Sequence, residues 1–461
     1  MRDFASSDVP QVPSGFMVER KGELCLLLHP ERPAWTVVNP SGLEVVSLCD
    51  GHHTVRDIAS IIASRYGREP TSVYPDVVGY LQQLDRAGML VFPVGAGSQE
   101  GQGRATKSLH LQVTARCNLR CRHCAIAGGP VQGDGLSTAR VRELIDELAK
   151  DGGGLLAITG GEPLLRADGL NLLRYACPRV KTILSTNAML IDRHVAQALS
   201  ELELAIQVSL DGASPAVHDG IRGQGAFAKA MRGVHLLQEH GLNDRLALCL
   251  TVMKPNLDDV PKVIELAHAE GIPALRLMPL QRMGRAAAAW SDLGVPPEQA
   301  ESLYAVLYRQ APRLHPDLAL SPGLQGFLLR VPEGGAWCRI GTLVAVDAAG
   351  DAYPCPLFTG PTYRLGNVKE MSLRQVLDSA RLKQLRETCQ ARKNRIHQCQ
   401  ACHWRNFCQG SCPGSVLLER GTLWEADDLC GLRRQLYRDT IFDLAEGRQR
   451  AAGLAQEAAC V

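Results

Sequence analysis

Three cysteines lie close together in the sequence, Cys117, Cys121 and Cys124, with the spacing C-x3-C-x2-C. A loop this short brings three thiolates near one another, and thiolates bind both zinc and iron–sulfur clusters. A structural zinc site takes four protein ligands, whereas a four-iron cubane with one iron free of protein takes three. The spacing therefore predicts a metal centre and leaves its metal open.

A second set of cysteines follows in the last third of the chain. Its members are Cys338, Cys355, Cys399, Cys402, Cys408, Cys412 and Cys430. From Cys399 onward the pairs could also hold zinc in a treble-clef or ribbon fold. The first fifteen residues have no apolar core of signal-peptide length, so we expect a cytoplasmic protein whose thiols are free for metals.

The middle of the chain alternates short apolar strands with amphipathic helices, which is typical of a parallel sheet built from βα units. The predicted strands are 109–114, 155–159, 182–186, 205–210, 246–251 and 275–279. The first cysteine loop directly follows the first strand. Polar residues and a glycine pair follow the next three, and loops of this kind share one rim of a barrel. These residues are Gly160, Gly161 and Glu162, then Ser185 and Asn187, then Ser209 and Asp211.

The first cysteine loop, with His123 at the position before Cys124, and the G-G-E-P sequence that begins at Gly160 resemble the radical S-adenosylmethionine superfamily. The resemblance implies a partial (βα)6 barrel. It also implies a [4Fe–4S] cluster held by the three cysteines, whose open iron chelates the amino and carboxylate groups of S-adenosylmethionine. Reductive cleavage of this cofactor gives a 5′-deoxyadenosyl radical, and the protein supplies position and the exclusion of water.

Cofactor contacts are carried over from this resemblance by matching position. Gly160, Gly161 and Glu162 are expected at the methionine amino end, with Ser185, Asn187, Ser209 and Asp211 on the same rim and Arg222 as the candidate for the carboxylate. Each residue also has a plainer interpretation. Asp211 could form a turn, Ser185 and Asn187 could cap a helix, and Arg222 could lie on a solvated loop.

The order of the seven later cysteines resembles the SPASM domain of radical S-adenosylmethionine enzymes that mature peptides and proteins, over roughly residues 335–432. The resemblance implies two auxiliary iron–sulfur clusters. One is held by Cys399, Cys402, Cys408 and Cys430, and the other by Cys338, Cys355 and Cys412. The further cysteine often found just upstream is missing from residues 330–337. That cluster therefore keeps an open iron or recruits another ligand, with Cys389 as one candidate.

Residues 16–92 are expected to form strands at 22–28 and 35–39 and helices at 43–48, 55–66 and 73–89, with Thr54 and Thr71 as helix caps. The pattern resembles the PqqD-like, winged-helix domain that recognises peptides, in which a leader peptide adds as a strand to the sheet edge and packs against the last helix. A plain winged helix could bind DNA. The formal charge of +2 and the few basic residues on these helices argue against nucleic acid or a membrane as partner.

The predicted fold is thus α/β. It comprises an N-terminal winged-helix-like α+β domain (16–92), a linker (93–108), the partial barrel (109–334), a cysteine-rich iron–sulfur domain (335–432) and a helical tail (433–461). The predicted function is maturation of a ribosomally made peptide, with a reductant such as flavodoxin or ferredoxin. A partner protein, as in sulfatase maturation, and a small molecule such as a tetrapyrrole are alternative substrates. A zinc-organised binding or regulatory protein is the alternative from another class, and no catalytic side chain beyond the cluster ligands is predicted.

Overall fold

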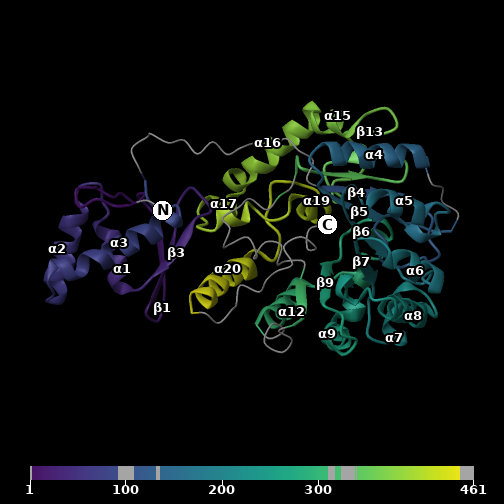
Figure 1. Cartoon of the computed structure of the whole chain (residues 1–461), viewed down its shortest axis with the longest axis horizontal. Coiled ribbons are helices and arrows are strands. Elements are labelled where there is room, and N and C mark those ends of the chain that lie inside the picture. The colour runs from purple at the N-terminus through teal and green to yellow at the C-terminus, as the bar shows by residue number, and fades with distance from the viewer. Residues whose placement is uncertain are drawn as a thin grey trace.

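The computed structural model describes residues 3–91, 108–130, 135–309, 317–322, 338 and 340–446. An N-terminal region lies at one end, a large parallel sheet covered by helices lies at the other, and cysteine-rich segments lie between them (Figure 1). The predicted linker at 93–108 falls almost entirely outside the described residues. No helix within the described ranges is long and apolar enough to cross a membrane.

The N-terminal region is a three-stranded antiparallel sheet followed by three helices. Its elements are β1 (Met17–Lys21), β2 (Leu24–Leu28), β3 (Trp35–Val38), α1 (Pro40–Leu48), α2 (Val55–Tyr66) and α3 (Pro70–Arg86). Thr54 caps α2 in a capping box with Asp57, as predicted. The predicted cap at Thr71 is wrong, because α3 already begins at Pro70, whose fixed φ suits the first turn of a helix.

The barrel contains the six predicted parallel strands in sequence order. They are β4 (Ser108–Gln112), β5 (Leu155–Thr159), β6 (Lys181–Thr186), β7 (Leu204–Ser209), β8 (Leu246–Val252) and β9 (Ala274–Pro279). The helices around them are α4 (Thr138–Lys150), α5 (Gly169–Ala176), α6 (Arg193–Ser200), α7 (Pro215–Arg222), α8 (Ala226–Glu239), α9 (Val260–Ala269), α10 (Gly284–Ala288), α11 (Trp290–Leu293) and α12 (Pro297–Arg309). The α/β fold and its partial barrel are therefore confirmed.

The sheet continues beyond these six strands at both edges. On one side β10 (Ala319–Pro322) pairs with β9, and on the other β11 (Leu343–Val346) pairs in parallel with β4. The hairpin strands β12 (Asp351–Tyr353) and β13 (Gly366–Asn367) then extend the β11 edge. The cysteine-rich region thus begins as part of the barrel sheet, whereas the sequence had suggested a separate unit.

Six helices complete the cysteine-rich region. They are α15 (Leu373–Leu377), α16 (Ala380–Arg395), α17 (His397–Gln400), α18 (Arg405–Cys408), α19 (Pro413–Arg420) and α20 (Cys430–Ala445). Helices α15 and α16 are separate, because Ser379 caps a new helix. The end of the predicted tail, from residue 447, lies outside the described residues.

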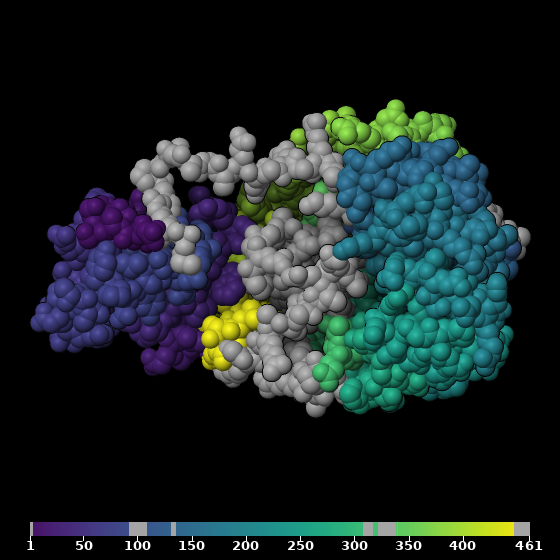
Figure 2. Space-filling model, viewed as in Figure 1, coloured from purple at the N-terminus to yellow at the C-terminus, as the bar shows by residue number. Residues whose placement is uncertain are grey.

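Helix α20 joins the N-terminal region to the rest of the molecule. Leu26 and Leu28 of β2 belong to the same apolar core as Tyr437 and Phe442 of α20. The alternate residue Leu27 packs instead in the core of the N-terminal helices. In the space-filling view, α20 (yellow) lies beside the N-terminal region (purple), on the side of that region that faces the barrel (Figure 2). The described part of the predicted tail, residues 433–446, therefore lies mostly in this docking helix.

Candidate active site

The first cysteine loop lies at the carboxyl end of β4. The thiols of Cys117, Cys121 and Cys124 form a small cluster with the apolar side chains of Leu119 and Ala226. Every cysteine that the structure describes is a free thiol. The Cys117 thiol interacts electrostatically with those of Cys121 and Cys124, and burial raises its pKa to about 11. Three neighbouring free thiols match the number of protein ligands that a cluster with one free iron takes.

The glycine pair after β5 brings the second rim loop against the chain that leads into Cys117. The amide of Gly161 donates to the Thr114 carbonyl at 2.8 Å, and the amide of Glu162 donates to the Arg116 carbonyl at 2.8 Å. A Cβ on Gly160 would lie 2.3 Å from the Thr114 oxygen, and one on Gly161 would lie 2.0 Å from the Arg116 oxygen. Only glycine allows this approach, and both amides are used within the protein.

Glu162 connects the loops after β5 and β6. Its carboxylate is fully buried and accepts hydrogen bonds from the Thr186 hydroxyl at 2.8 Å and from the Asn187 amide at 2.8 Å. Burial raises the pKa of Glu162. The Asn187 side chain in turn donates to the Asn118 side-chain oxygen at 2.8 Å. Glu162 and Asn187 thus tie the third strand's loop to the cysteine loop.

A buried charge network lies beneath the same rim. The Arg222 side chain donates through Nε to Oδ2 of Asp211 at 2.6 Å, and His123 Nε2 lies 3.4 Å from the same oxygen. Although burial opposes ionisation, Arg222 and His123 hold the pKa of Asp211 below its usual value. Burial lowers the pKa of His123 to about 4, so its imidazole is neutral at pH 7. Arg222 lies on α7 and is buried rather than solvated.

The structure places all the candidate cofactor residues at one end of the parallel strands. Ser185 lies on β6 and is paired with Gln207 of β7. Ser209 is the last residue of β7 and is paired with Cys249 of β8. Both are half-buried. The contacts of Gly160, Gly161, Glu162, Asp211 and Arg222 are mostly with other rim residues, so their contacts with S-adenosylmethionine stay a prediction.

Sequence reasoning missed Gly284 and Arg285, which lie at the start of α10 and contact the cysteine loop. Arg285 donates through Nε to the Cys121 carbonyl at 2.7 Å and through Nη1 to the Gly128 carbonyl at 2.9 Å. Its amide donates to the Cys124 carbonyl at 3.0 Å. The preceding Gly284 has φ +51°, and a Cβ there would lie 2.3 Å from the Ala125 oxygen. The Gly284-Arg285 pair was the available signal, 160 residues beyond the loop.

Four of the later cysteines gather in the loops around α17, α18 and the start of α20. The Cys399 thiol interacts electrostatically with Cys402, Cys408 and Cys430, and burial raises its pKa to about 12. The structure therefore brings together the four residues that the SPASM resemblance groups. We call them the outer cysteine set.

Side chains from α20 surround the outer cysteine set. Arg433 points Nη1 at the Cys408 sulfur at 3.6 Å and pairs with Asp427 at 2.5 Å. Tyr437 packs against Trp404 and Phe407, with ring centroids 5.5 and 6.5 Å apart. The helix therefore supplies both packing and a buried positive charge beside these thiols.

The other predicted group, Cys338, Cys355 and Cys412, also converges. The Cys355 thiol interacts with those of Cys412 and Cys338. Burial raises the pKa of Cys338 to about 12. We call these three residues the inner cysteine set, because Cys355 follows the strands that extend the barrel sheet.

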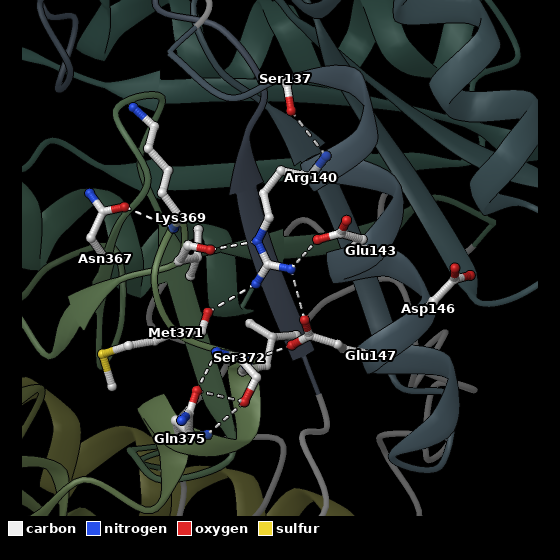
Figure 3. A network of polar contacts seen from close by, with 12 residues as sticks. Ser137, Arg140, Glu143, Asp146, Glu147, Asn367, Lys369, Met371, Ser372 and Gln375 are labelled. Carbon is white, nitrogen blue, oxygen red and sulfur yellow. Dashed lines mark hydrogen bonds and ion pairs between the residues drawn. The ribbon is translucent and has the colours of Figure 1, made fainter.

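A polar network fixes the cysteine-rich region to the barrel (Figure 3). Arg140 on α4 donates to the carbonyls of Val368 and Met371 and pairs with Glu143 and Glu147. Glu147 also accepts the Leu373 amide at 2.6 Å, at the start of α15. One helix of the barrel thus holds the turn between β13 and α15.

The sheet of the N-terminal region faces the outer cysteine set. The Asn406 side chain donates to the Pro30 carbonyl at 3.0 Å. A cavity of about 240 Å³ separates the two parts, and its lining includes Met17, His29, Cys402 and Arg405. The N-terminal region therefore sits directly beside the cysteine-rich region.

Family models match three parts of the chain. They are the radical SAM superfamily at residues 111–267, coenzyme PQQ synthesis protein D (PqqD) at 25–90 and an iron–sulfur cluster-binding domain (SPASM) at 338–403.

Two curated proteins are similar along much of their length. The mycofactocin maturase MftC of Mycolicibacterium smegmatis is 32% identical over 312 residues, which cover 65% of this chain and 76% of that protein. The Fe-coproporphyrin III synthase of Methanosarcina barkeri is 29% identical over 354 residues, which cover 70% of this chain and 87% of that protein.

Two solved structures share the fold. Streptococcus suis SuiB bound to precursor peptide SuiA has a TM-score of 0.58 at 15% identity, covering 91% of this chain and 99% of that one. The enzyme anSMEcpe with bound AdoMet and the Cp18Cys peptide has a TM-score of 0.60 at 19% identity, covering 74% and 99%. At these identities the likeness concerns the fold.

Proposed function

Because this chain belongs to the radical S-adenosylmethionine superfamily and carries PqqD and SPASM domains, we propose that it matures a ribosomally made precursor peptide. It is an enzyme that uses S-adenosylmethionine and [4Fe–4S] clusters. The observation that carries the peptide proposal is the docking of a PqqD region directly against the cysteine-rich region. The MftC relative is itself named a maturase.

We assign roles to the site residues as part of this proposal. Cys117, Cys121 and Cys124 hold the first cluster, and the outer and inner cysteine sets hold two auxiliary clusters. When bound, the first cluster and S-adenosylmethionine supply the radical that takes a hydrogen atom from the substrate. Gly160, Gly161 and Arg285 fix the first loop by backbone contact. Buried apolar and neutral groups around the thiols exclude water.

Five segments would carry this function. Residues 16–92 would recognise the leader, and residues 93–108 would link this recognition region to the barrel at 109–334. Residues 335–432 would hold the auxiliary clusters. Residues 433–461 begin with most of the docking helix α20. This division makes α20 one of the contacts between the recognition region and the cysteine-rich region.

The leader peptide would add to the edge of β3. Strand β1 forms the other edge, and its Glu19 and Lys21 already form ion pairs with α20. Next to β3, Gln83 of α3 donates its side-chain amide to the Val37 carbonyl at 2.8 Å. The β3 edge and α3 therefore form one surface on which main-chain bonds supply affinity and side-chain contacts supply selectivity.

The test uses the anaerobic holoenzyme with the peptide of a neighbouring short reading frame and a scrambled peptide as control. We expect slower hydrogen exchange in residues 35–38 and 70–86 with the true peptide alone. We also expect a mass change in that peptide once S-adenosylmethionine and reduced flavodoxin or ferredoxin are added. Cofactor cleavage without peptide protection or mass change would contradict the peptide proposal while leaving the enzyme class intact.

A tetrapyrrole is the second candidate substrate, favoured by the similarity to the Fe-coproporphyrin III synthase. The same reaction with a tetrapyrrole precursor of iron coproporphyrin in place of peptide separates the two. Formation of iron coproporphyrin with no effect of any peptide would support this alternative. A partner protein, as in sulfatase maturation, would instead appear as a mass change in a folded protein substrate.

A further inference from the structure

The inner cysteine set offers three thiolates, one fewer than a fully ligated cubane needs. No cysteine occurs between residues 323 and 337, just before Cys338. An open iron on this cluster could bind a substrate directly, whereas a fully ligated cluster is suited to carrying electrons. The identity of a fourth ligand therefore decides what this cluster does.

Cys389 is buried on a helix that is otherwise mostly polar. Helix α16 buries only three of its side chains, Leu382, Cys389 and Arg392. The Cys389 side chain is on the inner face, and the residue is 7% exposed. A buried free thiol on a charged helix points toward whatever the helix covers.

What α16 covers here is the inner cysteine set. Cys389 and Cys338 line the same cavity, of about 150 Å³, together with Ser411 and Pro413, the two neighbours of Cys412. The Cys389 thiol interacts electrostatically with those of Cys338 and Cys412. Cys389 and Cys338 therefore share one cavity, and both neighbours of Cys412 line it.

Arg392, one turn beyond Cys389, holds α16 against the Cys412 loop. Its guanidinium is fully buried and donates to the carbonyls of Gly410 at 2.7 Å and Ser411 at 2.8 Å. It also donates to the Leu423 carbonyl at 2.6 Å. The backbone that carries Cys412 and the helix that carries Cys389 are thus fixed relative to each other.

The remaining described cysteines lie elsewhere. Cys25 and Cys49 are in the core of the N-terminal region, Cys177 follows α5, and Cys249 lies within β8. None of them lines the cavity between α16 and Cys338.

We propose that Cys389 is the fourth thiolate of the cluster held by Cys338, Cys355 and Cys412, so that this cluster exposes no iron to substrate and transfers electrons. The assignment deepens the proposed function and rests on its auxiliary clusters, but it does not depend on the substrate. It predicts that a substrate thiolate does not bind this cluster.

The test isolates the auxiliary clusters in a variant with Cys117, Cys121 and Cys124 changed to alanine, because the first cluster also has a labile iron. This parent should hold about eight irons and give no three-iron electron paramagnetic resonance signal after mild ferricyanide oxidation. Adding Cys389→Ala should produce either about one such signal per chain or the loss of about four irons. Cys177→Ala and Leu382→Ala, the second also buried on α16, should behave as the parent.

Two results would overturn the assignment. One is a three-iron signal in the parent itself, and the other is a Cys389→Ala protein indistinguishable from the parent. An equal effect of Leu382→Ala would also overturn it, because loosened helix packing would then explain the change. Neither peptide nor S-adenosylmethionine enters the measurement, so failure of the peptide proposal leaves these outcomes readable.

Discussion

At the residue scale, the first cysteine loop is held by main-chain contacts rather than by charged side chains alone. Gly160 and Gly161 let the second rim loop touch the carbonyls of Thr114 and Arg116. Arg285 holds the loop's own carbonyls from the other side. Three thiols of a cluster need fixed positions, and these contacts to main-chain carbonyls supply them.

Gly161→Ala should separate the two rim loops. The added methyl would meet the Arg116 carbonyl at 2.0 Å, and overpacking of this kind costs about 1–3 kcal/mol. We expect a lower free energy of unfolding in urea and a loss of about one cluster's iron. Gly129→Ala is the matched control, because nothing lies within 4 Å of its Cβ. Full iron content in Gly161→Ala would argue against the contact.

Arg285→Ala should loosen the loop while leaving the three cysteines in place. It removes donors to the Cys121 and Gly128 carbonyls, and each unpaired buried acceptor costs about 1–3 kcal/mol. We expect faster release of iron from the first cluster to a chelator, by several-fold. Arg282→Ala, an exposed neighbour over the Trp290 ring, should release iron at the normal rate. Equal rates of iron release from the unmodified protein and from both variants would contradict this role of Arg285.

Local chemistry at this scale was readable from the sequence, and distant contacts were not. The cysteine spacing and the Thr54 cap each depend on neighbours within a few residues. Arg285 acts on a loop about 160 residues away, and the adjacent Gly284 does not identify the loop that it approaches. His123 occupies an aromatic position, yet its imidazole lies 3.4 Å from the buried carboxylate of Asp211.

At the scale of elements, the cysteine-rich region is attached to the barrel through a shared sheet and one helix. Strand β11 pairs with β4, so the first cysteine loop and the inner cysteine set begin on neighbouring strands. Helix α4 then holds the turn after β13 through Arg140 (Figure 3). The relative position of two metal centres thus depends on ordinary hydrogen bonds between elements.

Arg140→Ala should weaken this attachment. It leaves the Val368 and Met371 carbonyls without their donor, at a cost of about 1–3 kcal/mol each when buried. We expect a lower free energy of unfolding in urea and faster hydrogen exchange in residues 366–377. Glu143→Ala is the control, because its side chain is 61% exposed and an exposed ion pair contributes at most about 1 kcal/mol. Unchanged exchange in Arg140→Ala would contradict the role.

The six barrel strands were predictable because each is a short segment that carries several apolar residues and lies between amphipathic helices. Strands β10 to β13 are only two to four residues long, too short for a periodic signal. Strand β1 alternates between exposed and half-buried residues, so it lacked the apolar run that revealed β2. These segments form strands because they pair with neighbouring strands, rather than because of the strand propensity of their own residues.

At the scale of the whole molecule, the apolar run of β2 shows why the N-terminal region docks. A strand with one face in water alternates, whereas Leu24 to Leu28 is apolar at every position. Leu27 faces the N-terminal helices, and Leu26 and Leu28 face α20. The sequence contained the signal for a second covered face but did not identify the helix that covers it.

The docking should depend on apolar packing and little on the ion pairs around it. Arg438 pairs with Glu19 at 2.8 Å, and its side chain is 44% exposed, so Arg438→Ala should change stability by less than about 1 kcal/mol. Phe442 is fully buried in the shared core, and Phe442→Ala should cost about 3–5 kcal/mol. The two variants therefore separate charge from packing at the same interface.

We expect Phe442→Ala to free the N-terminal sheet, seen as faster hydrogen exchange in β2. Cleavage of S-adenosylmethionine without peptide should persist, because the first cysteine loop lies on the barrel. Turnover of the precursor peptide should fall at least tenfold, since a leader held by an undocked region no longer places its core peptide at the rim. Arg438→Ala should retain both activities. If Phe442→Ala exchanged faster in β2 yet processed peptide normally, a rigid connection would be unnecessary and the leader would act only as a tether.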